Sequence, residues 1–231
     1  MAFMDRVWSK TMEVVRSEVQ QSYLQELAAG TLPIEKFRYQ IKQNYKYLLE
    51  YSKVFALAIA KSPDFRTMVR FHNILDEAME HEVPFYHKYY QEKLNIEPHE
   101  LDSVIMDSMN RAYTSHERAC AWEGGLAELV ISVLPCAVCY REQVKLLDPL
   151  CKLPKGHPYR EWIDMYLGEV YIKAVEETIE LANELAENKT ELELKKLEEI
   201  YLASCMYELL SWDMYYNMKF WPLPQLFKGL S

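Results

Sequence analysis

The feature that most constrains this chain is where its helix-breaking residues fall. It has only six glycines and ten prolines, and most prolines stand where a helix would begin or end. After Pro33, for example, Phe37, Ile41, Tyr45 and Leu48 recur at three- and four-residue spacings. No segment shows the sustained alternation of a strand. The sequence therefore predicts an all-α fold.

The long periodic segments are joined by short loops, which favours a compact helical bundle in a single domain. Predicted helices cover residues from about 3–28, 33–61, 65–93, 101–122, 126–147, 159–188 and 190–218. The heptad register is not kept from one helix to the next, so an extended coiled coil is not expected. We expect residues 1–220 to form the helical domain and 221–231 an irregular C-terminal tail.

Composition excludes several classes of partner. The net charge of −9 leaves no excess of Lys and Arg to neutralise phosphates, so nucleic acid is not expected to bind. No window approaches the roughly 18 apolar residues of a membrane span, and the N-terminus lacks the apolar core of a signal peptide. Five cysteines, an odd number, then suggest a cytoplasmic protein with reduced thiols.

One cysteine stands in an unusual setting. Cys136 follows Pro135 directly, and a proline inside a helix distorts it locally. Tyr140 lies four residues later, on the same helix face as the thiol. Cys136 and Cys139 form a C-x-x-C, but no second pair exists to complete a zinc site. Spacing alone leaves these cysteines as ordinary core residues.

Two other segments carry polar side chains in apolar surroundings. Glu208 stands among Cys205, Leu209 and Trp212, and a buried carboxyl there would be a candidate acid or base. Asn44 and Tyr47 share a helix face and would hold a planar polar ring if they face inward. Periodicity leaves open whether Glu208 and Asn44 face the interior or the solvent.

Taken in order, these segments resemble the TenA/thiaminase II family, whose fold is like that of haem oxygenase. The match covers nearly the whole chain. The residues that carry it are Gln43-Asn44, Leu134-Pro135-Cys136 with Tyr140, Gly156-His157-Pro158 with Trp162-Ile163 and Tyr166, and Tyr207-Glu208 with Trp212 and Met214. The resemblance implies a homotetramer that uses no cofactor.

The resemblance also implies roles for individual residues. Cys136 matches the nucleophile that attacks a pyrimidine ring, Glu208 the carboxyl that contacts a ring nitrogen, and Tyr140 a tyrosine close to the thiol. The implied reaction is hydrolysis of 4-amino-5-aminomethyl-2-methylpyrimidine or thiamin to the hydroxymethyl pyrimidine, in thiamin salvage. The residues that match substrate-binding positions are Asn44, Tyr47, Tyr113 and Tyr166.

Asn44 departs from the family pattern, which usually has Asp at this position to bind the amidine edge of the ring. An amide still donates and accepts hydrogen bonds, but it carries no charge. The alternative is therefore a pyrimidine-binding or regulatory homologue with weakened catalysis.

Metal-dependent chemistry is a further alternative. Glu77 and His81 are four residues apart, with Glu80 and Glu82 nearby, a spacing that suits iron or another metal. The last two predicted helices contain no His to complete a second set, so a charged helix face is the preferred interpretation. Haem is disfavoured because no His precedes His72.

Overall fold

The structure is a computed structural model that describes residues 1–76, 79, 91–227 and 229, and within these ranges it contains helices and no strand. The α-helices are α1 (Phe3–Val19), α2 (Ser22–Ala29), α3 (Ile34–Lys61), α4 (Phe65–Asp76), α6 (Pro98–Asp102), α7 (Ser108–Glu123), α8 (Leu126–Leu147), α9 (Pro158–Tyr166), α10 (Glu169–Ala186) and α11 (Glu191–Asn217). Two short 3₁₀ helices are also present: η2 (Asp148–Leu150) comes after α8, and η3 (Pro224–Phe227) comes after α11. The predicted all-α fold is confirmed.

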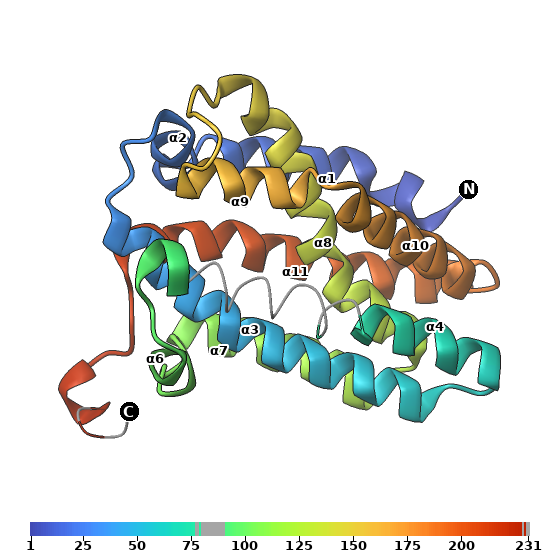
Figure 1. Ribbon diagram of the computed structural model, residues 1–231. Coiled ribbons are helices and arrows are strands. Elements are labelled where there is room, and N and C mark those ends of the chain that lie inside the picture. Colours follow the sequence, from blue (N-terminus) through green and yellow to red (C-terminus); the bar gives the residue numbers. More distant parts are fainter. Residues whose placement is uncertain (77–78, 80–90, 228, 230–231) are drawn as a thin grey trace.

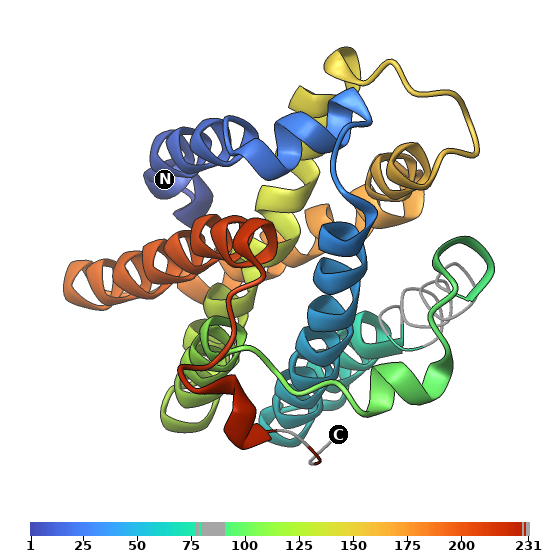
Figure 2. The ribbon, with the colours of Figure 1, turned by 90° about the vertical axis from the view of Figure 1, so that its left-hand side faces the viewer.

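Helix α8 runs through the centre of the bundle. It packs against α1, α3, α7, α10 and α11 (Figures 1 and 2). Such a position requires a helix that is apolar on most of its circumference, and α8 is buried from Leu129 to Pro135 and again from Val138 to Val144. The half-buried gap between these runs consists of Cys136 and Ala137.

Several predicted boundaries agree with the structure. Gly30 ends α2 in the left-handed conformation, at a φ of 74° that favours glycine. Gly124 and Gly125 separate α7 from α8, and Pro135 is accommodated inside α8. The seventh predicted helix corresponds to α11, whose first turn is closed by a capping box between Thr190 and Glu193.

Three predicted helices are interrupted. The first divides into α1 and α2 at Gln20 and Gln21, where the Gln25 side chain donates to the carbonyl of Val19 at 2.6 Å. The sixth divides at Leu167 and Gly168, where the backbone of Gly168 turns to an extended conformation before α10. Side-chain capping and tertiary packing can end a helix without a proline.

The fourth predicted helix is also wrong at its start. It divides into the short α6 and the longer α7, with residues 103–107 between them. The Asp107 side chain accepts from the backbone N–H of Met109 at 2.8 Å and thereby begins α7. Of the third predicted helix, α4, residue 79 and residues 91–94 are helical, and residues 77–78 and 80–90 lie outside the described residues.

The C-terminal segment leaves the end of α11 and turns toward α7 (Figure 2). The indole of Trp221 donates to the carbonyl of Met106 at 2.9 Å, and η3 follows. Among the described helices, none combines the length and apolar character that crossing a membrane requires.

Candidate active site

Cys136 lies in the middle of the central helix, at the point where α8 is least regular. Pro135 has no N–H to donate to the carbonyl of Ile131, so the backbone ladder of α8 is interrupted there. The Cys136 side chain is half-buried, whereas Cys139, one turn later, is fully buried. The two cysteines of the C-x-x-C are therefore not equivalent, and only Cys136 is open to a ligand.

Two adjoining hollows meet at Cys136. The outer one is lined by Asn44, Tyr47, Leu48, Tyr51, Cys136, Ala137, Tyr140, Tyr166 and Tyr171. The inner one is lined by Asn44, Tyr47, Asn110, Tyr113, Cys136, Tyr140, Glu208, Ser211 and Tyr215. Their volumes are about 40 and 10 Å³, so both hollows are small.

Glu208 occupies the inner hollow and is only 3% exposed. The Tyr113 hydroxyl donates to its Oε1 at 2.7 Å. Burial raises the pKa of Glu208 to about 7, against the opposing effect of hydrogen bonds with Tyr113 and Cys136. A carboxyl with this pKa exchanges protons near neutral pH, beside the thiol.

A second buried carboxyl lies behind the pocket wall. Glu117, on α7, is fully buried, and the Tyr47 hydroxyl lies 2.6 Å from its Oε1. Burial raises the pKa of Glu117 well above its usual value, although the hydrogen bond with Tyr47 opposes the shift. Tyr47 therefore connects this acid with the hollow that contains Cys136.

Asn44 faces the interior and is 5% exposed. Its position depends on the neighbouring Gln43, whose side chain accepts from the backbone N–H of Asp107 at 2.8 Å. Asn110 in turn donates to the Gln43 carbonyl at 2.8 Å. These bonds attach α3 to the first turn of α7 and place two side-chain amides, from Asn44 and Asn110, in the hollow.

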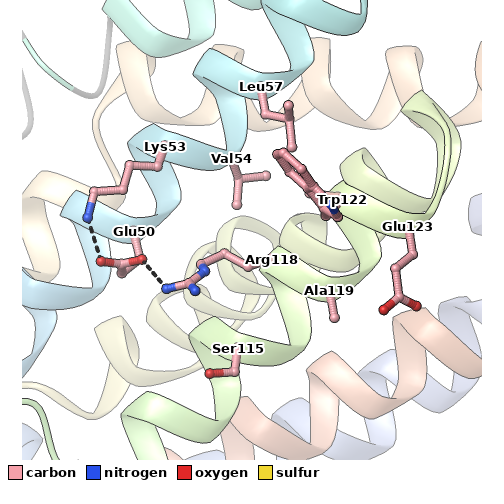
Figure 3. A pocket seen from close by; sticks show the side chains of 10 residues that line it. Glu50, Lys53, Val54, Leu57, Ser115, Arg118, Ala119, Trp122 and Glu123 are labelled. Carbon is pink, nitrogen blue, oxygen red and sulfur yellow. Dashed lines mark hydrogen bonds and ion pairs between the residues drawn. The ribbon is translucent and has the colours of Figure 1, made fainter.

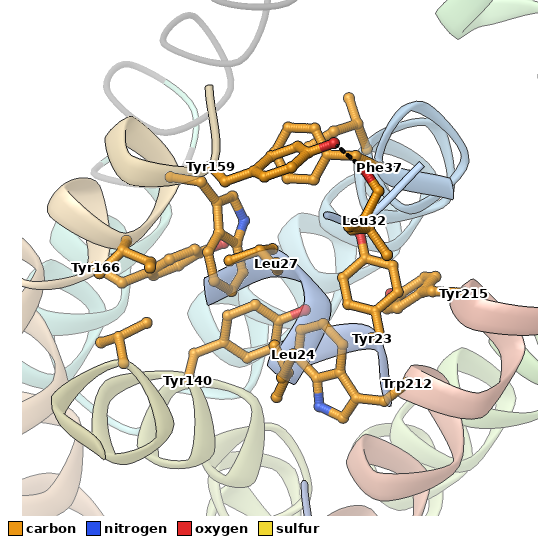
Figure 4. Packing of buried hydrophobic residues seen from close by; sticks show 14 of the residues in the cluster. Tyr23, Leu24, Leu27, Leu32, Phe37, Tyr140, Tyr159, Tyr166, Trp212 and Tyr215 are labelled. Atoms are coloured by element: carbon orange, nitrogen blue, oxygen red, sulfur yellow. Dashed lines mark hydrogen bonds between the residues drawn. The ribbon is translucent and has the colours of Figure 1, made fainter. Parts of the chain in front are cut away.

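Aromatic side chains form the remaining walls, and two of them, Tyr140 and Tyr166, belong to the packed hydrophobic cluster drawn in Figure 4. The ring centroid of Tyr140 lies 4.9 Å from the ring centroid of Tyr166 and 5.5 Å from that of Trp212. The ring centroids of Tyr47 and Tyr113, which also line the inner hollow, are 5.3 Å apart. Flat walls of this kind are suited to stacking on a planar ligand ring.

The structure brings together every residue that the sequence placed at the site. Cys136, Asn44, Tyr47, Tyr140, Tyr166, Tyr113 and Glu208 all line the two hollows. His157 is elsewhere, because its side chain accepts from the N–H of Tyr159 and caps α9. Its segment contributes by starting the helix that carries Tyr166.

Sequence reasoning missed several lining residues, although helical spacing contains a signal for most of them. Tyr51 follows Tyr47 by four residues, Asn110 precedes Tyr113 by three, and Ser211 follows Glu208 by three. A search for polar or aromatic residues one turn from each candidate would have found them. Tyr171 has no such relation, because it lies on α10, beyond the break that the sequence did not reveal.

A larger groove, of about 490 Å³, lies between α3 and α7 (Figure 3). Its main charged groups are already paired, since Glu50 forms ion pairs with Lys53 at 2.7 Å and with Arg118 at 3.1 Å. It contains no thiol. The smaller hollows at Cys136 are therefore the better candidate for an active site.

Among the described residues, no three His, Cys, Asp or Glu side chains are grouped closely enough to hold a metal ion. The predicted alternative metal ligands Glu77, Glu80, His81 and Glu82 lie outside the described residues.

The protein is thus an all-helical protein in which a cysteine, Cys136, and a carboxyl, Glu208, share a pocket with aromatic walls. A model described as the TENA/THI-4/PQQC family matches residues 11–218, and the chain belongs to this family. The resemblance seen in the sequence is thereby confirmed.

Individual relatives agree over nearly their whole length. An aminopyrimidine aminohydrolase from Halalkalibacterium halodurans is 32% identical over 225 residues, which cover 96% of this chain and 98% of that protein. An aminopyrimidine aminohydrolase from Bacillus subtilis is 31% identical over 222 residues, which cover 96% of this chain and 92% of that protein. A TenA homologue from P. horikoshii OT3 matches with a TM-score of 0.86 over 94% of this chain and 99% of that one; at 22% identity it shows the fold.

Proposed function

We propose that this protein is an aminopyrimidine aminohydrolase, which hydrolyses 4-amino-5-aminomethyl-2-methylpyrimidine to the hydroxymethyl pyrimidine in thiamin salvage. The observation that carries the proposal is the placement of Glu208, hydrogen-bonded with Cys136, inside a pocket with aromatic walls. The relatives named aminopyrimidine aminohydrolase give independent support.

The chemistry needs a thiolate and a proton donor on the same ring. Direct displacement by water at the exocyclic carbon is slow, so a thiolate first adds to the pyrimidine ring and disrupts its aromaticity. The amine then leaves as ammonia, water adds to the exocyclic carbon, and the thiolate departs. We assign the attack to Cys136 and the protonation of a ring nitrogen to Glu208.

The remaining residues would hold the ring in place. Asn44 can both donate and accept at the amidine edge of an aminopyrimidine. Tyr47, Tyr113 and Tyr166 supply flat walls, and Tyr140 lies one helical turn from the thiol. The small hollow favours the single-ring aminomethyl pyrimidine over thiamin, which carries a second ring.

A direct test is to incubate the protein with the aminomethyl pyrimidine and measure ammonia and the hydroxymethyl product. We expect both products in equal amounts, with kcat/KM higher than for thiamin. Binding of the pyrimidine without release of ammonia would contradict the enzymatic proposal. It would support the second candidate function, a pyrimidine-binding or regulatory protein, which the amide at Asn44 favours.

Replacing Asn44 with aspartate tests the amidine-edge assignment. A charge-assisted hydrogen bond is roughly twice as strong as a neutral one. We therefore expect kcat/KM for the aminomethyl pyrimidine to rise about tenfold, which corresponds to a gain of about 1.4 kcal/mol in transition-state binding. The matched control is Asn110→Asp, which adds the same charge from α7. If Asn44→Asp gains nothing, or Asn110→Asp gains as much, Asn44 does not bind the amidine edge.

The site is formed by residues of one chain, but we expect several copies of the chain to associate. We propose a cytoplasmic homotetramer, supported by the family resemblance and by large exposed apolar side chains such as Trp122 and Phe65. Sedimentation velocity at micromolar concentration should give a tetramer, and a monomer there would contradict this assignment.

A further inference from the structure

Glu117 is a buried acid for which the proposed reaction has no direct use. It lines neither hollow, yet its Oε1 lies 2.6 Å from the Tyr47 hydroxyl, which lines both. Its other oxygen, Oε2, is buried and has no hydrogen-bond partner. Such an arrangement is costly for an ionised group and calls for a physical explanation.

The surroundings of Glu117 disfavour a negative charge. Among the described residues no Lys, Arg or His forms an ion pair with it, because the adjacent Arg118 points into the surface groove and pairs with Glu50. Burial is the main cause of its raised pKa, and the charges of Glu208 on α11 and Glu50 on α3 add to the shift. Hydrogen bonds with Tyr47 and Tyr113 oppose the shift without reversing it. A buried carboxyl in this company is stable as the neutral acid.

The position of the acid proton follows from the two oxygens. On Oε2, the O–H would be a buried donor without an acceptor. On Oε1, the O–H donates to the Tyr47 oxygen and leaves Oε2 as a carbonyl oxygen, for which the lack of a partner costs less. In the neutral acid the hydrogen bond therefore runs from Glu117 to Tyr47, whereas the Tyr47 hydroxyl donates when Glu117 is ionised.

This direction fixes the orientation of the Tyr47 hydroxyl. Since its oxygen accepts from Glu117, its own hydrogen must point elsewhere, toward the hollow. Cys136 lines both hollows beside Tyr47, and after burial its charge raises the pKa of the Tyr47 hydroxyl, as that of Glu117 does. Glu208 also acts on Tyr47, but it already accepts from Tyr113, which leaves a thiolate at Cys136 as the acceptor for this hydrogen.

We propose that Glu117 is a positioning residue: as a neutral acid it donates to Tyr47, and so makes the Tyr47 hydroxyl a hydrogen-bond donor to the Cys136 thiolate. The inference rests on the proposed role of Cys136 as the nucleophile. It assigns to α7 a residue that acts on the thiol through a neighbour, without touching the substrate.

The test measures the thiol itself. The rate at which iodoacetamide alkylates Cys136 is followed from pH 5.5 to 10, in a Cys120→Ser background that removes the other half-exposed thiol. Mass spectrometry identifies the alkylated residue. In Glu117→Met, which keeps the side-chain volume but cannot donate, we expect the midpoint of the pH profile to rise by about one unit. The fraction of thiolate at neutral pH then falls about tenfold.

Glu117→Gln separates a directional hydrogen bond from simple packing. Its amide N–H₂ can donate to the Tyr47 oxygen as the acid does, so its profile should stay closer to wild type than that of Glu117→Met. The matched control is Glu18→Met, which removes an equally buried carboxyl that lines neither hollow. It should leave the midpoint unchanged.

Tyr47→Phe supplies a second measurement that does not depend on the stability of Glu117→Met. It should raise the midpoint by a similar amount, and adding Glu117→Met to it should cause no further shift. The proposal is overturned if Tyr47→Phe leaves the profile unchanged, or if Glu117→Gln shifts it as far as Glu117→Met. Alkylation needs no turnover, so loss of the proposed hydrolase activity and loss of this effect are distinguished.

Discussion

Replacing Cys136 with serine is expected to lower the hydrolysis rate by at least about 1,000-fold, because removal of a covalent nucleophile commonly has effects of this size or larger. A serine hydroxyl is a much weaker nucleophile unless a base activates it. Binding of the aminomethyl pyrimidine should persist, since the aromatic walls and the amides remain. The measurements are kcat from ammonia release and Kd from calorimetry.

The control for this change is Cys120→Ser. Cys120 is also half-buried, but burial and neighbouring carboxylates raise its pKa to about 11, and it lines neither hollow. Its replacement should leave kcat within about twofold, because Cys120 lines neither hollow. Retention of activity by Cys136→Ser would refute the covalent mechanism.

Replacing Glu208 with glutamine is expected to lower kcat/KM by about 100- to 10,000-fold, the usual contribution of a general acid. The amide keeps the shape of the side chain and can still hydrogen-bond with Tyr113. It cannot give up a proton to the ring nitrogen. A loss of kcat/KM in Glu208→Gln would therefore be caused mainly by the missing proton transfer and only slightly by altered packing.

The pH profile gives a second measure of the same role. Burial raises the pKa of Glu208 to about 7, so the acid form predominates below that pH and is lost as the pH rises through it. In the wild type, kcat/KM should fall on the alkaline side with a midpoint near 7. This decline should be absent in Glu208→Gln, and a wild-type rate that stays constant from pH 7 to 9 would contradict the assignment.

The two buried acids explain why one carboxyl is suited to proton transfer and the other to positioning. Glu208 lines the inner hollow, and its hydrogen bonds with Tyr113 and Cys136 keep its pKa near neutral in spite of burial. Glu117 lies behind Tyr47, without access to the hollow. The same side chain thus acquires different chemistry from its position relative to the cavity.

The sequence determined the helical character of the chain and much of its chemistry. Apolar spacing predicts α3, α8 and α11, and the position of Tyr140 one turn after Cys136 puts both on one helix face. These features depend on interactions within four residues along the chain, and such interactions can be read from the order of the residues.

Only the tertiary structure decided which of these side chains meet. Periodicity could not say whether Glu208 faces inward, and it gave no indication that Glu117 on α7 contacts Tyr47 on α3, seventy residues away. The break at Leu167 and Gly168 was hidden for the same reason. Long-range packing determines which face of each helix is buried, and it can override local preference. An active site assembled from α3, α7, α8, α9, α10 and α11 is therefore visible only in the folded protein.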